Sequence, residues 1–129
     1  METIGSGLAK LETDGHRADI YLSRPEKRNA VTVALMRDLT AAFEAVDADE
    51  EIRAIALLGE GPVFCAGMDL EMMRDRALPD ETVEWEWFST LLETIETARQ
   101  PVVAGIKGAA PAGGFELTLP CDIRVLGSE

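Results

Sequence analysis

A carboxylate surrounded by small and apolar residues is the first feature of this sequence that could do chemistry. Residues 105–122, GIKGAAPAGGFELTLPCD, are rich in glycine and alanine and carry Glu116. An acid with apolar neighbours costs free energy unless it has a partner or a catalytic task. Small residues let a backbone approach another group closely, so this stretch could bring a general acid or base up to a bound molecule.

A second glycine-bearing segment, FCAGMD at 64–69, also follows a predicted buried strand. Both segments would present backbone N–H groups at the carboxyl edge of a sheet, where open α/β sheets bind their ligands. Two convergent N–H donors form an oxyanion hole, which stabilises a carbonyl oxygen that gains negative charge in an enolate or a tetrahedral intermediate. Glu116 would lie in the first turn of a helix opened by the later segment, close enough to act on the same bound group.

Each signal also has a purely structural interpretation. Glycines permit tight packing of a helix on a sheet, and a glutamate near a helix N-terminus can be a capping carboxylate. Motifs of other reaction classes are missing: GxxxxGK[ST], GxGxxG and GxSxG do not occur, and no His, Cys or Asp spacing suggests a metal site. The single histidine, His16, follows the turn signal Asp14-Gly15 and is predicted in a surface turn, while Cys65 and Cys121 are predicted to be buried thiols.

Composition excludes several classes of partner. The chain has 129 residues, a length that suits one domain, and 47% hydrophobic residues, enough for a core. Its net charge of −12 disfavours nucleic-acid binding. No apolar run approaches the ~20 residues needed to span a bilayer, and the N-terminus lacks a signal-peptide layout. The sequence therefore predicts a cytoplasmic protein that binds neither nucleic acid nor membrane.

Hydrophobic patterning predicts the elements that position the two glycine segments. A β-hairpin is expected over 7–23. A helix capped by Thr32 follows it, with an apolar face of Met36, Leu39, Phe43 and Val46. Buried strands are expected at 52–59 and 101–106 and a final strand at 121–126. The other predicted elements are helical structure from near Asp69, a charged loop at 74–81, a helix from Asp80 to about Ala98 with a stripe of Val83, Trp87, Leu91 and Ile95, and a short helix ended by Pro120.

This order is typical of an α/β fold in which helices join parallel strands. The final strand has no helix after it to cover it, although parallel sheets are normally buried on both faces. That is a first indication that residues 1–129 hold only part of a larger domain.

Three segments together resemble successive signatures of the enoyl-CoA hydratase/isomerase, or crotonase, superfamily. They are RPEKRNA, PVFCAGMDL and PVVAGIKGAAPAGGFELTLPCD, and they occur in the family's order. The resemblance runs from about Gly7 to Glu129. It implies a ClpP/crotonase-type spiral of β-β-α units, incomplete at the C-terminus. Residues 1–129 would form the N-terminal portion of this domain, because family members are longer and their second catalytic glutamate lies beyond residue 129.

The resemblance also implies roles for individual residues. The backbone N–H groups of Met68 and Gly113 would form the oxyanion hole, and Glu116 matches the first of the two catalytic glutamates. The family's coenzyme A contacts fall on Lys27 and Arg28, near the phosphates, and on Ala30 in the same loop. Further contacts fall on Ala66, Asp69 and Leu70, around the adenine and the pantetheine arm. Three more side chains, Met72, Met73 and Trp87, could line the acyl pocket or belong to the core.

The function implied is hydration of 2-enoyl-CoA thioesters through an enolate-like transition state, in fatty-acid or related acyl-CoA metabolism. Coenzyme A would be part of the substrate, with no separate cofactor and no metal, and the family forms trimers or hexamers. Glu116 favours hydration over isomerisation, because isomerases often lack an acid there. The alternatives are a non-catalytic coenzyme A-binding or assembly fragment and an enoyl-CoA isomerase. One departure is Ala112, where many members have glycine; Gly113 is retained.

Overall fold

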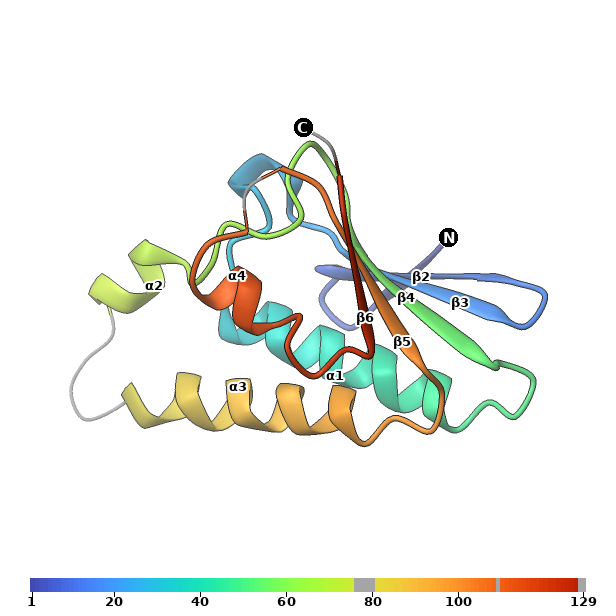
Figure 1. Cartoon of the computed structure of the whole chain (residues 1–129). Helices are drawn as coiled ribbons and strands as arrows, with labels where there is room; N and C mark the ends of the chain where they lie inside the picture. Colours follow the sequence, from blue (N-terminus) through green and yellow to red (C-terminus); the bar gives the residue numbers. More distant parts are fainter. Residues whose placement is uncertain (76–80, 109, 128–129) are drawn as a thin grey trace.

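The structure, a computed structural model, describes residues 1–75, 81–108 and 110–127. Within these residues six strands form one sheet, in which spatial order follows chain order (Figure 1). The strands are β1 (Glu2–Ile4), β2 (Ala9–Asp14), β3 (Arg17–Leu22), β4 (Ala54–Gly59), β5 (Val102–Ile106) and β6 (Ile123–Leu126). The helices are the 3₁₀ turn η1 (Pro25–Lys27), α1 (Val33–Asp47), α2 (Leu70–Asp75), α3 (Glu81–Glu96) and α4 (Gly113–Glu116).

The predicted hairpin is confirmed and gains a third strand. Asp14 pairs with Arg17 across its turn, and β1 adds to the outer edge of β2. β1 was not predicted, because a tertiary contact supports it. The loop that follows β1 is held by the buried carboxylate of Asp38 on α1, which accepts hydrogen bonds from Ser6 N at 3.1 Å and Leu8 N at 3.0 Å.

Strands β3 to β6 run parallel to one another. Their carboxyl ends therefore meet at one edge of the sheet. The segments 23–31, 60–69 and 107–113 leave the sheet from that edge, after β3, β4 and β5 respectively. The topology thus brings together the three segments that the sequence singled out.

Helices α1 and α3 lie side by side on one face of the sheet (Figure 1). Thr32 caps α1 as predicted: its Oγ1 accepts a hydrogen bond from Leu35 N at 3.1 Å. The predicted apolar face of this helix, Met36, Leu39, Phe43 and Val46, is buried. The stripe predicted for α3 is only partly correct, since Leu91 and Ile95 are buried but Val83 is 38% exposed.

Two boundaries differ from the prediction, and one lies outside the described residues. Arg74 and Asp75 belong to α2, so the predicted charged loop at 74–81 begins later than expected. Its central part, 76–80, is not among the described residues. The predicted start of the long helix at Asp80 is likewise outside them. The last helix ends at Glu116, and the N–H groups of Thr118, Leu119 and Cys121 then donate to the carbonyl three residues before each of them.

The second face of the sheet is less covered than the apolar strands suggested. Ile55 and Leu57 of β4 are buried, but Ala56 and Leu58, which point to the other face, are half-buried. The prediction that β4 and β5 are buried on both faces is therefore wrong for this face. The physical reason is that α1 and α3 pack on the same side of the sheet (Figure 1).

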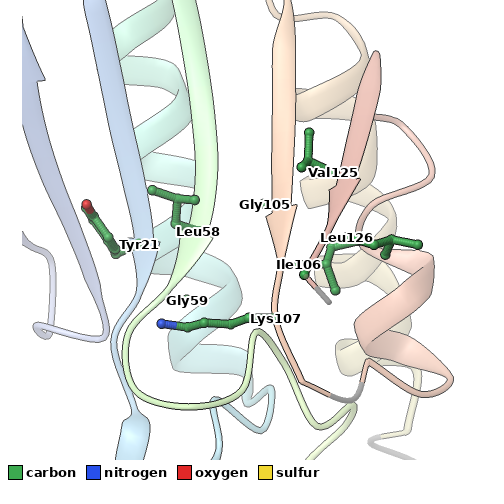
Figure 2. Close-up of a pocket in the computed structure, with 9 residues that line it drawn as sticks. Tyr21, Leu58, Gly59, Gly105, Ile106, Lys107, Val125 and Leu126 are labelled. Atoms are coloured by element: carbon green, nitrogen blue, oxygen red, sulfur yellow. The ribbon is translucent and has the colours of Figure 1, made fainter. Parts of the chain in front are cut away.

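An apolar hollow of about 310 Å³ opens on this second face among β3 to β6 (Figure 2). Tyr21 pairs with Leu58 and Gly105 pairs with Val125 across the strands that line it. Gly105 leaves the gap in this row, because a Cβ there would lie 2.7 Å from Leu58 Cδ2. Beside the hollow, edge strand β6 exposes Ile123, Val125 and Leu126.

We expect the 129-residue chain by itself to self-associate through this edge. Val125 is 55% and Leu126 71% exposed, and β6 pairs with β5 alone among the described strands. An exposed apolar edge strand is a template for further strand pairing. Sedimentation velocity should show concentration-dependent oligomers that Val125→Lys reduces, while Thr3→Lys on the opposite edge strand β1 should change little. A wild-type chain that stays monomeric over a hundredfold range of concentration would contradict this expectation.

In the part of the chain that the structure describes, no helix has the length and apolar character required to cross a membrane.

Candidate active site

The first glycine turn, after β4, is held by a short parallel bridge to the loop after β3. Val31 N donates to Gly67 O at 2.8 Å, and Asp69 N donates to Val31 O at 2.8 Å. These two bonds lie on either side of Met68, which pairs with Val31. In extended backbone, adjacent residues direct their N–H groups to opposite sides, so the Met68 N–H faces away from Val31. Gly67 has φ of +100°, a conformation that favours glycine.

The second glycine turn leads from β5 into α4. Gly114 N donates to Pro111 O at 2.9 Å, and Glu116 N donates to Ala112 O at 2.9 Å. Gly113 is the first residue of α4 and is buried. The N–H of a first helical residue has no partner within its own helix. Gly113 N is therefore available to a group outside the helix.

The two turns pack backbone against backbone. A Cβ built on Gly114 would lie 2.4 Å from Cys65 O, and one built on Gly67 would lie 3.3 Å from Pro111 O. These glycines therefore have the packing role that the structural interpretation assigned to them. The close approach also serves the site, because a Cβ built on Gly113 would lie only 3.5 Å from Met68 N.

The predicted pair of donors is thus brought together. Within the described residues, neither Met68 N nor Gly113 N donates a hydrogen bond to another group of the protein. Both lie at the edge of the sheet where the parallel strands end. Two backbone N–H groups that point at one oxygen atom stabilise negative charge on it.

Glu116 lies in the single short turn of α4, one turn from Gly113. It is exposed, and its carboxylate forms no hydrogen bond or ion pair with any described residue. The alternative of a capping carboxylate is not supported, because the Glu116 carboxylate accepts no hydrogen bond from a backbone N–H of the described residues. Glu116 is therefore free to act on a ligand.

Ala112, the position where the sequence departs from the family, has a strained backbone. Its φ of 45° and ψ of −114° belong to a region that residues with a Cβ rarely adopt. Strain of this kind costs about 1–3 kcal/mol. Ala112 directly precedes Gly113, so its strained backbone conformation helps to set the path of the second glycine turn.

We expect Ala112→Gly to raise the free energy of unfolding by about 1 kcal/mol, because relief of strain exceeds the greater chain entropy of glycine. Urea unfolding would measure the change. Ala48→Gly is the matched control: Ala48 has a φ of −79°, which alanine adopts without strain, so its replacement should destabilise the chain slightly. Equal destabilisation by both variants would mean that Ala112 is not strained.

The predicted coenzyme A loop carries two available positive charges. Lys27 and Arg28 are exposed at the end of η1, where Arg28 has φ of 52°. The third basic residue of the segment is engaged internally: Arg24 Nη1 donates to Asp69 Oδ2 at 2.6 Å and to Ala30 O at 3.0 Å. Of the three basic residues in this segment, Lys27 and Arg28 are therefore the two that are open to a ligand.

Asn29 is a residue that the sequence reasoning missed. It is fully buried, and its Oδ1 accepts a hydrogen bond from Arg24 N at 2.8 Å. Its Nδ2 donates to Glu60 O and Val63 O, each at 2.9 Å, and lies 3.1 Å from Phe64 O. Asn29 thus joins the predicted coenzyme A loop to the segment between β4 and the first glycine turn. The signal that could have found it is that it is the only asparagine in the chain.

The predicted wall residues have different placements. Leu70 is 75% exposed and Ala66 is half-buried. Asp69 is buried and engaged: Oδ1 accepts from Met72 N at 2.8 Å, which caps α2, and Oδ2 accepts from Arg24. The Met72 N–H and then the Arg24 guanidinium hold the pKa of Asp69 below its ordinary value. Because the pKa is lowered on folding, this carboxylate stabilises the fold above the ordinary aspartate pKa and loses that effect as the pH falls.

The candidate acyl-pocket residues separate into two groups. Trp87 is half-buried against the core, and the Arg37 guanidinium lies 5.3 Å from the centre of its ring. Packing between α1 and α3 therefore accounts for Trp87. Met72 and Met73 are half-buried on α2, and Met73 lines an open hollow of about 340 Å³ together with Leu70 and Arg74.

The thiols and the histidine are placed as predicted. Cys65 and Cys121 are buried and free, and burial raises the pKa of each thiol to about 11. Both are therefore protonated near neutral pH. His16 is exposed in the hairpin turn, where its Nδ1 lies 2.7 Å from Glu51 O. Among the described residues no group of three or more His, Cys, Asp or Glu side chains is arranged to hold a metal ion.

Comparison with known proteins gives a consistent result. The family model for enoyl-CoA hydratase/isomerase matches residues 12–129. The chain is 35% identical over 131 residues to the enoyl-CoA hydratase EchA19 of Mycobacterium tuberculosis, covering 98% of this chain and 49% of that protein. It is 37% identical over 125 residues to the enoyl-CoA hydratase ACTT6 of Alternaria alternata, covering 97% of this chain and 41% of that protein.

Solved structures agree with the sequence relatives. An enoyl-CoA hydratase/carnithine racemase from Magnetospirillum magneticum matches with a TM-score of 0.87 and 31% identity, over 95% of this chain and 47% of that chain. An enoyl-CoA hydratase from Thermoplasma volcanium matches with a TM-score of 0.87 and 31% identity, over 92% and 48%. The chain spans about half the length of the curated relatives it matches.

Proposed function

The chain belongs to the enoyl-CoA hydratase/isomerase family, and on this premise we propose that it forms the N-terminal portion of an enoyl-CoA hydratase. The carbonyl oxygen of a 2-enoyl-CoA thioester binds to Met68 N and Gly113 N. As water adds to the double bond, negative charge moves onto this oxygen, and the two donors stabilise the enolate. Glu116 takes up or delivers a proton of the reacting water.

We also propose which residues bind the nucleotide, the pantetheine arm and the acyl chain of the substrate. Lys27 and Arg28 bind phosphates of coenzyme A, which is part of the substrate, so that no separate cofactor is required. Ala66 and Leu70 contact the nucleotide and pantetheine, and the acyl chain enters the hollow beside Met73. Fatty-acid or related acyl-CoA metabolism, a homo-oligomeric state and a cytoplasmic location stay predictions.

One observation carries the proposal: the turns that bear the two backbone donors pack against each other, and neither Met68 N nor Gly113 N donates to a described residue. Close packing of the two turns is enough to explain why glycine occupies these positions. It does not explain why both N–H groups are left without an internal acceptor, because a buried or half-buried N–H without a partner costs about 1–3 kcal/mol. A ligand oxygen supplies the missing acceptor.

Amide NMR on the 129-residue chain tests the proposal. Acetoacetyl-CoA, whose enolate places negative charge on oxygen, should shift the Met68 and Gly113 amide protons downfield. Coenzyme A without an acyl group should shift amides of residues 26–30 and leave the Gly113 amide largely unchanged. If acetoacetyl-CoA binds without moving the Met68 and Gly113 amides, these donors do not form an oxyanion hole.

The competing function is a coenzyme A-binding fragment without turnover. The exposed Lys27 and Arg28 would suffice to bind the nucleotide of coenzyme A, whether or not the two backbone donors and Glu116 act on a thioester. We expect the 129-residue chain alone to show no hydration of crotonyl-CoA by absorbance. A chimera that continues it with the C-terminal half of EchA19 should restore turnover. Failure of a folded chimera that binds acyl-CoA would favour the non-catalytic function.

A further inference from the structure

The Arg24–Asp69 ion pair lies where the predicted coenzyme A loop meets the first glycine turn. Arg24 follows β3, and Asp69 directly follows Met68. The nitrogen and oxygen of the pair are 2.6 Å apart, and the side chains are only 17% and 10% exposed. Neither charge is therefore well placed to contact a ligand directly. A short, largely buried ion pair needs a different explanation.

Further hydrogen bonds from the two side chains join three segments. Arg24 Nη1 also donates to Ala30 O at 3.0 Å, so it closes the loop that presents Lys27 and Arg28. The other carboxylate oxygen of Asp69 accepts from Met72 N at 2.8 Å and holds the start of α2. The loop, the first glycine turn and α2 are thus connected through one pair of side chains.

The backbone around Met68 makes the same connection. Val31, which follows Ala30, forms hydrogen bonds with the residues on both sides of Met68. Any displacement of the loop end is therefore passed to the Met68 N–H through the Val31 bridge and through Asp69. Networks of packed side chains, hydrogen bonds and ion pairs of this kind can carry energetic coupling between two sites.

We infer that Arg24 and Asp69 are positioning residues that couple nucleotide binding on the loop to the orientation of the Met68 N–H. This inference rests on the proposed function. Lys27 and Arg28 hold the phosphates, and the Arg24–Asp69 pair holds the loop against the turn. Binding of the nucleotide end of the substrate then orders the donor that receives the thioester oxygen.

The test uses a probe that binds the loop but has no thioester carbonyl to place in the proposed oxyanion hole. Adenosine 3′,5′-bisphosphate carries the nucleotide end of coenzyme A without pantetheine or thioester. In amide NMR of the wild-type chain it should shift residues 26–30 and also the Met68 amide. In Asp69→Asn, which retains an oxygen to cap α2, the loop shifts should persist and the Met68 shift should fall at least threefold.

Matched variants separate coupling from general damage. Asp19→Asn removes a carboxylate from another arginine pair, Arg17–Asp19 at 3.0 Å, and should leave the Met68 shift unchanged. Arg24→Gln should reproduce the loss seen in Asp69→Asn, and Arg24→Lys, which keeps a charged donor, should restore most of the shift. If Asp69→Asn does not fold, the two Arg24 variants decide the question by the same comparison.

The outcomes distinguish this inference from the function on which it rests. Loop shifts without a Met68 shift in the wild type, or an undiminished Met68 shift in Asp69→Asn and Arg24→Gln, would overturn the coupling alone. Absence of any loop shift would overturn the coenzyme A assignment together with the coupling. The inference is supported if the Met68 shift is lost in Asp69→Asn and Arg24→Gln and retained in Arg24→Lys and Asp19→Asn.

Discussion

Replacing Glu116 with glutamine is expected to lower the rate of crotonyl-CoA hydration by about 10²–10⁴-fold, the usual contribution of a general acid or base. The enzyme for this measurement is the chimera in which the chain is continued by the C-terminal half of EchA19. Glutamine keeps the size of the side chain and removes its ability to exchange a proton. The absorbance of the conjugated thioester follows the reaction directly.

The effect should be confined to the chemical step. Glu116 is exposed and forms no hydrogen bond or ion pair with a described residue, so the glutamine variant should unfold at the same urea concentration as the parent. Its affinity for coenzyme A should also be unchanged. Glu93→Gln on α3 is the matched control, because it removes an exposed carboxylate elsewhere. A Glu116→Gln rate within about twofold of the parent would show that Glu116 has no acid–base role.

Replacing Asn29 with alanine is expected to lower the free energy of unfolding by about 3–5 kcal/mol. The change deprives Arg24 N of its acceptor and the carbonyls of Glu60 and Val63 of their donor. Each buried polar group left unpaired costs about 1–3 kcal/mol. Since small domains are stable by only about 5–15 kcal/mol, urea unfolding should show a large shift.

Asn29→Gly separates the loss of stability caused by the missing hydrogen bonds from the loss caused by backbone strain in the alanine variant. Asn29 has φ of 57°, a left-handed conformation that asparagine and glycine tolerate better than alanine. The glycine variant loses the same hydrogen bonds without the strain, so it should be more stable than the alanine variant by about 1 kcal/mol. If the free energy of unfolding of Asn29→Ala lies within about 1 kcal/mol of the wild-type value, the side-chain hydrogen bonds to Glu60 and Val63 are not important for stability.

Features decided by neighbouring residues could be predicted from the sequence. The turn of the hairpin, the Thr32 cap and the buried face of α1 each depend on residues within a few positions of one another. The two glycine turns were also predicted, because each follows an apolar strand and local backbone conformation requires small residues there. The chemistry of an oxyanion hole followed from these turns and from Glu116 in the helix after them.

Features decided by contacts between distant segments could not be predicted in this way. Asn29 binds carbonyls more than 30 residues along the chain, and Arg24 pairs with Asp69 across 45 positions. Arg24 is close in sequence to Lys27 and Arg28, the predicted phosphate ligands, but tertiary packing engages it with Asp69. Periodicity placed Val83 in the core, but helix α3 leaves it exposed because the side chains of a helix are buried only where a partner surface extends far enough.

The α/β class, the order of the principal elements and the residue types of the candidate site can be derived from the sequence without a structure. The packing of Gly113 against Met68 N and the sparse covering of the second face of the sheet become visible only in the folded chain. The physical reason is one of range. Capping, turn formation and amphipathic patterning depend on residues close together in the chain, whereas the meeting of two turns depends on the parallel register of strands that carry them.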